Sequence, residues 1–490
     1  EIASCLVGSE MCIRDSYDTN GDGIGDLRGV IEKLDYLKDL GVDIIWLSPC
    51  YRSPLADQGY DISDYYDIDP RFGTMADMDE LIAEAKKRDM YILMDLVVNH
   101  CSDEHEWFKK ACEDPDGKYG NFFYLRDKKE GELPTNWRSY FGGPVWEDLP
   151  GTNKQYLHVF HKKQPDLNWE NPAVRKEVFD MMNWWCEKGI DGFRMDVISM
   201  ISKPEGLPDG KIPEGGLYGD SGCVNGPHVH EYLQEMNREV LSKYDLMTVG
   251  ECAGVTIEEA EKYASADGKE LSMVFQFELV DLASGTYGKW TDKRVPLKDF
   301  KRVMTAWQTE LEGKAWNSLF LGNHDQPRCL SRFGDDSPEY RVVSAKMLAT
   351  CLHMMQGTPY VYQGDELGMK NVPFHDLSEF RDIESINAFH ELTGAGKVAP
   401  DDMMRYLNLR GRDNARTPMQ WDDTASAGFT TGTPWIKVGP DYETVNAKNE
   451  MADPDSVYNY YKKLIHLRKE KDIMAVSYTH LRAHETRGNL

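Results

Sequence analysis

The sequence predicts an α/β protein built as a (β/α)8 barrel, the TIM barrel fold. Strand-like and helix-like segments alternate along the chain, which is typical of βα units that form a parallel sheet. Several apolar runs also end in polar residues, and a barrel gathers the carboxyl ends of its strands at one face. These two observations predict both the fold and the place of a functional site.

The first clear helix covers residues 28–40. There Val30, Leu34 and Leu37 recur at helical spacing, and Gly41 supplies a stop. The apolar runs that follow are typical of buried strands. They are 42–49, 91–100, 189–197, 246–251, 272–279, 317–325 and 358–366. The remaining strand, the first of the barrel, would fall at the amino-terminal end.

The two ends of the chain look foreign to the rest. Residues 1–16 and 477–490 match neither the periodicity nor the turn signals of their neighbours, and they resemble translated sequencing-adapter sequence. We therefore expect both to be non-native and to take no part in the fold. The barrel then comprises residues 17–100 and 168–476.

Two long segments interrupt the βα rhythm. Residues 101–167 are rich in Gly, Pro and aromatic residues and are too long for an ordinary loop, so we expect a small inserted domain after the third strand. A second excursion, residues 370–421, follows the last strand and could form one wall of a pocket.

Composition narrows the range of partners. The net charge of −27 disfavours nucleic acid and anionic lipid, and no apolar run is long enough to span a bilayer. The ten cysteines show no CxxC or zinc-ligand spacing, which fits a reducing compartment. We expect a cytoplasmic monomer that binds a small neutral molecule such as a sugar, but neither nucleic acid nor membrane.

A pair of carboxyl groups suits displacement at the anomeric carbon of a sugar. Asp196 and Glu251 end consecutive predicted strands, and neighbouring strands lie ~4.7–4.9 Å apart. A retaining mechanism needs two carboxyl groups ~5–5.5 Å apart, one ionised and one protonated. Arg194, on the same strand face as Asp196, is expected to hold that carboxylate ionised, and burial would keep Glu251 protonated.

Five ordered motifs carry a family resemblance. They are DLVVNH (95–100), QPDLNW (164–169), DGFRMDV (191–197), VGE (249–251) and NHDQPR (323–328). With them, the chain from about Tyr17 to Val476 resembles the α-amylase superfamily of glycoside hydrolases. The resemblance implies Asp196 as nucleophile, Glu251 as general acid/base and Asp325 as a third carboxylate that grips the sugar. Further contacts with the sugar and the nucleophile would come from His100, Arg194 and His324.

Two further segments are similar to the oligo-1,6-glucosidase and α-glucosidase branch: residues 57–74 and 411–421. This similarity implies a retaining α-glucosidase that acts on non-reducing ends of short α-glucans, and a C-terminal β-sandwich that this chain lacks. Asp57 and Arg412 would pair around the terminal hydroxyls. The same sugar would also contact Tyr60, Phe160 and Gln164.

Linkage choice is predicted from Val197, the residue directly after the expected nucleophile. Its apolar side chain offers no hydroxyl to an incoming 4-linked sugar, and related enzymes with Val here are associated with α-1,6 linkages. The resemblance therefore implies isomaltose-type oligosaccharides as preferred substrates.

A metal site is expected in the segment DTNGDGIGD. Its oxygen-bearing residues occur at alternate positions, and Gly23 allows a sharp turn. Related glucosidases carry a structural Ca2+ in this loop. The expected ligands are Asp18, Asn20, Asp22, the Ile24 carbonyl and Asp26.

Three alternatives remain open at the level of sequence. Two are enzymes of the same branch, a trehalose-6-phosphate hydrolase and a sucrose isomerase. The third is a non-catalytic, glucosidase-like partner protein, although such proteins lack the three carboxylates found here.

Overall fold

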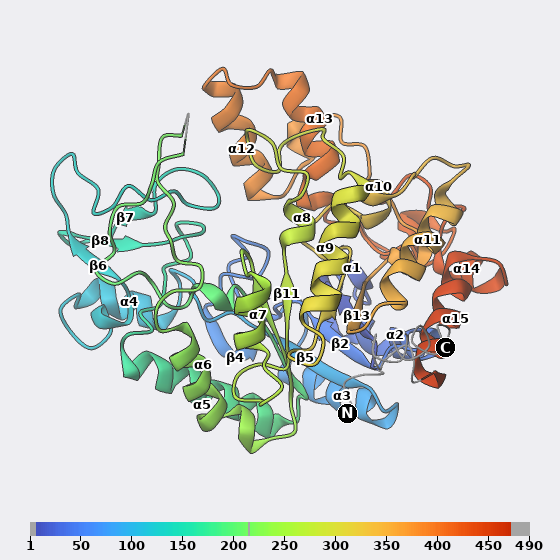
Figure 1. The fold of residues 1–490 in the computed structure, drawn as a ribbon, viewed down its shortest axis with the longest axis horizontal. Helices are drawn as coiled ribbons and strands as arrows, with labels where there is room; N and C mark the ends of the chain where they lie inside the picture. Colours follow the sequence, from blue (N-terminus) through green and yellow to red (C-terminus); the bar gives the residue numbers. More distant parts are fainter. Residues whose placement is uncertain (1–5, 214–215, 472–490) are drawn as a thin grey trace, which may run out of the picture.

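The computed structural model describes residues 6–213 and 216–471, which form a nearly closed barrel of eight parallel strands (Figure 1). The strand order is β11-β10-β9-β5-β2-β1-β13-β12, and a backbone bridge between Val274 and Asn317 joins the two edges. The strands are β1 (Gly8–Met11), β2 (Ile44–Leu47), β5 (Tyr91–Leu96), β9 (Gly192–Met195), β10 (Met247–Cys252), β11 (Met273–Gln276), β12 (Ser318–Leu319) and β13 (Thr358–Tyr362). The predicted barrel is confirmed.

Each of the seven predicted apolar runs contains one barrel strand. Helices cover the outside and side chains fill the inside, so both faces of these strands are buried and the runs are almost continuously apolar. Inside the barrel, the rings of Trp46 and Phe275 pack 5.7 Å apart. Continuous apolar runs were therefore sufficient to locate seven of the eight strands.

The prediction that residues 1–16 take no part in the fold is wrong for the part that the structure describes. Gly8–Met11 pairs in parallel with β2 on one side and β13 on the other, and α1 (Ile13–Ser16) follows. The sequence GSEM carries no strand signal. It pairs because the edges of β2 and β13 would otherwise leave backbone groups without partners. Residues 1–5 and 477–490 lie outside the described residues.

Helices surround the barrel in chain order. The predicted helix 28–40 is confirmed as α2, which ends at Gly41 in a left-handed conformation with φ 103°. Helix α2 covers Leu27–Leu40. The other helices near the barrel are α3 (Met75–Lys87), α5 (Pro172–Lys188), α6 (Val229–Glu239), α7 (Ile257–Tyr263), α8 (Glu278–Asp281), α9 (Leu297–Glu310), α10 (Cys329–Phe333), α11 (Arg341–His353), α14 (Ala447–Ala452) and α15 (Val457–Glu470). The last of them, α15, packs against α2 and α11, so the end of the described chain lies beside its beginning.

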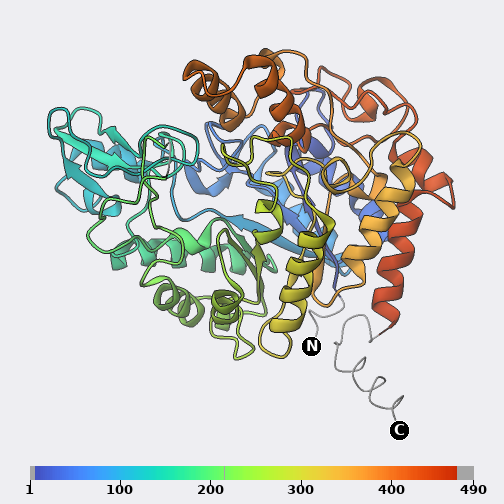
Figure 2. The ribbon, with the colours of Figure 1, turned by 45° about the horizontal axis from the view of Figure 1, so that its top comes forward.

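Two regions extend beyond the barrel. Between β5 and α5, an antiparallel sheet in the order β6-β8-β7 accompanies α4 (Glu106–Glu113). After β13, the chain forms α12 (Ile383–Gly394) and α13 (Pro400–Arg410). Figures 1 and 2 show the small sheet on the left and these two helices at the top. The remaining strands are β3 (Tyr51–Arg52), β4 (Asp64–Ile68), β6 (Leu125–Asp127), β7 (Trp146–Asp148) and β8 (Lys154–Leu157).

Two global features agree with the composition. Within residues 6–213 and 216–471, no helix is both long and apolar enough to cross a membrane. The cysteines in the same residues are all free thiols, and most of them are buried.

Candidate active site

Asp196 and Glu251 lie side by side at the carboxyl ends of β9 and β10. The two strands pair in register, with Val249 opposite Arg194 and Gly250 opposite Met195, so the next residue on each strand is one of the two carboxylates. Both are largely buried, at 7% and 5% exposure. The structure thus brings together the pair that the sequence placed on consecutive strands.

A single guanidinium bridges this pair. Arg194 donates through Nη1 to Asp196 Oδ1 at 2.8 Å and through Nη2 to Glu251 Oε2 at 2.6 Å. Nη1 also lies 2.9 Å from Asp95 Oδ1. The backbone N–H of Val197 donates to the same Glu251 oxygen at 3.2 Å. One buried cation therefore serves three carboxyl groups.

This shortage of positive charge changes the titration of Asp196. Burial raises its pKa well above the usual range, and Glu251 and Asp95 raise it further against the opposing effect of Arg194. Burial likewise raises the pKa of Asp95. Arg194 favours the ionised form of Asp196, as expected, while burial and the two neighbouring carboxyl groups oppose it.

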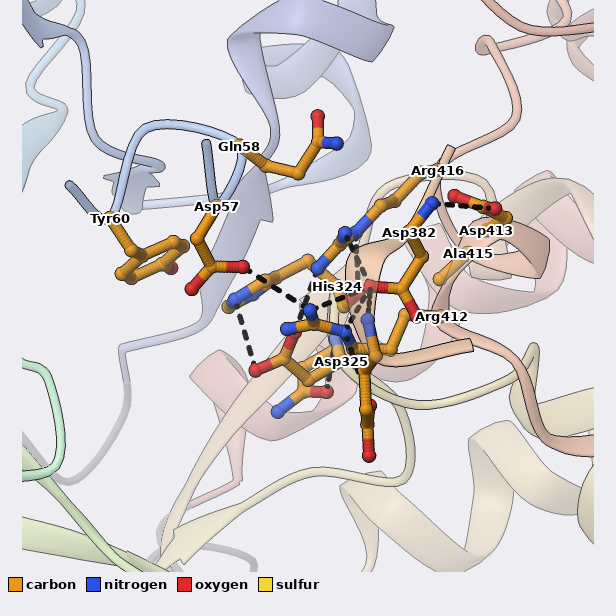
Figure 3. Close-up of polar contacts among 12 residues, drawn as sticks. Asp57, Gln58, Tyr60, His324, Asp325, Asp382, Arg412, Asp413, Ala415 and Arg416 are labelled. Atoms are coloured by element: carbon orange, nitrogen blue, oxygen red, sulfur yellow. Dashed lines mark hydrogen bonds and ion pairs between the residues drawn. The ribbon is translucent and has the colours of Figure 1, made fainter. Parts of the chain in front are cut away.

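Asp325 lies in a different electrostatic setting, with two arginines beside it. Its Oδ1 accepts hydrogen bonds from Arg412 Nη1 at 3.0 Å and Arg416 Nη2 at 2.9 Å (Figure 3). Burial alone would raise the pKa of Asp325, but His324, Arg412 and Arg416 outweigh it and hold the pKa well below the usual range. These neighbours favour the charged form of this carboxylate.

Asp57 and Arg412 form the expected ion pair at one end of the site, at 3.2 Å. Figure 3 shows Arg412 between Asp57, Asp325 and Asp382, and its Nη2 lies 2.6 Å from Asp382 Oδ1. The other oxygen of Asp57 accepts from Gln164 Nε2 at 3.1 Å. This end of the site is closed by polar and charged side chains from the β2–β4 region, the inserted segment and the 412–416 turn.

Aromatic and histidine rings complete the walls. Tyr60 stacks on His324 with centroids 5.2 Å apart, and its hydroxyl donates to Asp95 at 3.0 Å. His100 lies 5.3 Å from the ring of Phe160, and its Nε2 is 3.0 Å from the carbonyl oxygen of Tyr60. All of these predicted residues therefore belong to one site.

The site encloses a cavity of about 390 Å³. Its size suits a small ligand, and pockets of this kind combine apolar walls with a few polar groups that fix orientation. Of the predicted residues, it is lined by Asp57, Tyr60, His100, Phe160, Asp196, Val197, Glu251, Asp325 and Arg412. Arg194, Gln164 and His324 lie behind this layer and contact it.

Val197 borders the cavity in a strained conformation. Its φ is 35°, in the left-handed region that β-branched residues rarely adopt. Such strain costs about 1–3 kcal/mol and persists only where surrounding contacts impose it. Here the strained backbone directs the Val197 N–H to Glu251, and it sets the side chain against the cavity.

Several residues of the site were missed from sequence. Asp95 could have been found, because a carboxylate within the apolar run YILMDLVV needs a buried partner. Lys203 is fully buried with its Nζ 2.6 Å from Asp166 Oδ2, and this pair ties the inserted segment to the loop after β9. Other missed residues come from distant parts of the chain, and three of them lie in the excursion 370–421 that was expected to form a pocket wall. They are Tyr140, Phe141, Phe277, Asp281, Lys289, Asp382, Glu384 and Arg416.

The expected metal loop is a tight turn that contacts a distant part of the chain. Asp18 accepts N–H groups from Asn20, Gly21 and Gly23 and the hydroxyl of Thr430. Asp26 caps α2 and accepts from Thr19, while Asn20 and Asp22 are exposed. A side chain at Gly23 would place its Cβ about 1.9 Å from the Thr433 carbonyl oxygen. In the described residues, no three His, Cys, Asp or Glu side chains converge as a metal site.

Residues 14–477 match the family described as the catalytic domain of alpha amylase. The chain belongs to this family. It is 58% identical to an oligo-1,6-glucosidase of Parageobacillus thermoglucosidasius over 94% of this chain and 82% of that protein. It is 51% identical to a trehalose-6-phosphate hydrolase of Bacillus subtilis over 93% of this chain and 81% of that protein.

Solved structures of this family share the fold. The isomaltulose synthase of a Klebsiella species superposes with a TM-score of 0.93 at 43% identity, covering 96% of this chain and 84% of that one. The chain therefore has relatives whose names indicate different reactions on the same fold. The fold alone does not show which of these reactions a given member catalyses.

Proposed function

We propose that this chain is a retaining α-glucosidase that releases α-glucose from the non-reducing ends of short α-glucans, with a preference for α-1,6 linkages. The observation that carries the proposal is the closed end of the cavity. There the Asp57–Arg412 pair stands beside Asp325, within the same cavity as Asp196 and Glu251. A chain can enter such a cavity only by its terminal sugar. Oligo-1,6-glucosidases among the relatives support the assignment.

In the proposed first step, an Asp196 carboxylate oxygen attacks the anomeric carbon while the glycosidic C–O bond breaks. Glu251 gives its proton to the departing oxygen. In the second step, Glu251 takes a proton from water, the resulting hydroxide oxygen attacks the same carbon, and Asp196 leaves. The sugar is released with its original configuration, and both carboxyl groups return to their starting states.

The hydrogen bonds around this pair support the two roles. Arg194 contacts both carboxyl groups and holds them side by side. Glu251 Oε2 accepts from both Arg194 and Val197, which leaves Oε1 to donate to a leaving group. Asp325, held charged by two arginines, is suited to accept hydrogen bonds from sugar hydroxyls.

The charged groups near the entrance favour a neutral substrate over a phosphorylated one. Lys289 is paired with Glu384, and Arg138 donates to both oxygens of Glu391 at 2.8 and 3.0 Å. Phosphate recognition needs cations that are available to the ligand, whereas these two are already matched by carboxylates. This supports an α-glucosidase over a trehalose-6-phosphate hydrolase.

Product analysis by NMR tests the proposed function directly. The protein is incubated in turn with isomaltose, maltose, trehalose 6-phosphate and sucrose, and the first product is observed before mutarotation. We expect α-glucose from isomaltose at the highest rate. Initial β-glucose would contradict a retaining mechanism. Faster cleavage of trehalose 6-phosphate than of isomaltose, or conversion of sucrose to an isomer, would contradict the proposed substrate.

We also propose that the loop 18–26 binds a structural Ca2+ through Asp18, Asn20, Asp22, the Ile24 carbonyl and Asp26. An all-oxygen donor set suits this hard cation, and Asn20 and Asp22 are accessible to it. Chelation should lower the melting temperature of the protein, and Asp22→Ala should remove the response to added Ca2+. Identical melting with chelator and with Ca2+ would contradict the site.

We further propose a monomer that works in the cytoplasm. The free thiols throughout the described residues support a reducing compartment. Sedimentation of the purified protein and fractionation of the source cells would test the two statements separately.

A further inference from the structure

The entrance to the cavity is spanned by a contact between two regions that lie far apart in the sequence. Residues 138–144, which we call the entrance hairpin, are closed by a bridge between Arg138 and Pro144. The hairpin carries Tyr140 and Phe141, both of which line the cavity. Its neighbour across the entrance is α12, which follows the last barrel strand.

Three contacts join the entrance hairpin to α12. The Arg138 guanidinium makes a two-pronged ion pair with Glu391. Asn387 Nδ2 donates to the Phe141 carbonyl oxygen at 3.0 Å. Glu391 also lies directly over Gly142, where an added Cβ would come within 2.8 Å of its Oε2. Gly142 has φ 94°, so the backbone here adopts a turn that brings it beneath the carboxylate.

The Arg138 side chain lies between two openings. It lines one cavity of about 540 Å³ together with Lys289 and Glu384, and a second of about 870 Å³ together with Tyr140. Lys289, Glu384 and Tyr140 also line the active-site cavity. Each opening therefore shares lining residues with the active site. Arg138 lies at the boundary between the two openings, as do Pro213 and Tyr218, and its partner Glu391 lines the first.

We propose that the Arg138–Glu391 pair is a latch that holds the entrance hairpin to α12 and limits the size of the group attached to the reacting sugar. With the latch closed, a leaving group must pass through one of two separate openings, which suits short unbranched chains. With the latch open, the openings merge and bulkier chains fit. This inference rests on the proposed function and adds a residue pair that determines substrate size.

The strength of the pair suits a latch. Arg138 is 46% and Glu391 29% exposed at the side chain, so water screens their attraction and the pair contributes little to global stability. The hairpin itself is held by backbone bonds, among them Ser139 N–H to Gly143 O at 2.9 Å and Tyr140 N–H to Val159 O at 2.9 Å. Breaking the latch therefore loosens the hairpin from α12, to which the Asn387–Phe141 hydrogen bond still joins it, without unfolding it.

Two measurements on the full-length protein test the latch, and one of them does not depend on activity. In Arg138→Ala and Glu391→Ala, amide hydrogen exchange of residues 139–143 should become about fivefold faster, because the hairpin opens more often. The ratio of kcat/KM for isomaltohexaose to that for isomaltose should rise by up to about fivefold. In the double variant Arg138→Glu/Glu391→Arg, the rate of amide hydrogen exchange should return towards that of the wild type.

Arg28→Ala is the matched control, since Arg28 makes a similar two-pronged pair with Glu80 on the barrel surface. It should change neither measurement. Unchanged exchange in both alanine variants would overturn the latch, whatever the enzyme hydrolyses. Faster exchange with an unchanged ratio in an active enzyme would overturn its role in substrate size. Absence of any glucosidase activity in the wild type would instead contradict the proposed function, and with it the size role, while exchange still decides the latch.

Discussion

Two groups of buried carboxylates lie in the same cavity and differ in the positive charge that they share. The proton-exchange group contains Asp95, Asp196 and Glu251 around Arg194. The anchoring group contains Asp57, Asp325 and Asp382 around Arg412 and Arg416. The pKa of Asp196 is raised and that of Asp325 is lowered, although both are carboxyl groups in one cavity. Both side chains are buried, so the cationic neighbours of Asp325, which are His324, Arg412 and Arg416, account for the opposite direction of its shift.

The largest expected effect breaks the proton-exchange group itself. Asp196→Asn or Glu251→Gln should lower kcat by at least ~10²–10⁴-fold, because each removes one half of a two-step displacement. The assay uses an aryl α-glucoside, with circular dichroism to verify the fold. A folded variant that keeps a tenth of wild-type activity would contradict the assignment.

Removing the shared cation should damage the fold as well. Arg194→Met leaves three buried carboxyl groups without a guanidinium, and breaking a buried ion pair costs about 3–5 kcal/mol. The free energy of unfolding, measured in urea at pH 7, should fall by that amount. Arg28→Met removes an exposed arginine of the same length and should cost less than about 1 kcal/mol. Equal losses would mean that the proton-exchange group does not depend on Arg194.

The pH dependence of stability should have opposite signs in the two groups. Asp325 has a lowered pKa, so its contribution is present above the usual carboxyl pKa near 4 and is lost as the pH falls below it. Asp196 has a raised pKa. Its ionisation therefore penalises the folded state increasingly as the pH rises from the usual carboxyl pKa towards the raised one. A tenfold change in an acid dissociation constant on folding corresponds to about 1.4 kcal/mol of stability.

Thermal melting between pH 2 and pH 7 checks these signs. Relative to wild type, Asp325→Asn should be less stable at pH 7, and the difference should shrink as the pH falls below about 4. Asp196→Asn should gain relative stability over the same rise in pH. The same sign for both variants would show that burial alone controls the two groups.

The smallest expected effect concerns Val197, whose N–H supports Glu251. Val197→Thr keeps the β-branched shape, and hence the strained backbone, but adds a hydroxyl to the cavity wall. The ratio of kcat/KM for maltose to that for isomaltose should rise, by at most ~1–3 kcal/mol of discrimination. An unchanged ratio would mean that other parts of the cavity wall determine the preferred linkage.

Local pattern in the sequence was enough to locate seven of the eight barrel strands and the pair Asp196 and Glu251. Asp196 and Glu251 end apolar runs, so their place followed from the topology of a barrel. The anchoring group was only partly predictable, since Arg412 meets Asp57 across 355 positions and Asp382 gives no local signal. Gly8–Met11 was missed because its residues have low strand propensity. It becomes a strand because it pairs with the edges of β2 and β13.

The contact between the loop 18–26 and residues 430–433 has a consequence for biosynthesis. The hydroxyl of Thr430 and the carbonyl of Thr433 pack onto a loop that leaves the ribosome hundreds of residues earlier. Strand β1 likewise waits for β13 before its second edge is paired. Contacts of such high sequence separation slow folding, because the intervening chain must be ordered before they form. The amino-terminal segment of the nascent chain therefore stays unfinished until nearly all of the described chain has been translated, and its unpaired strand edge is open to other chains for that interval.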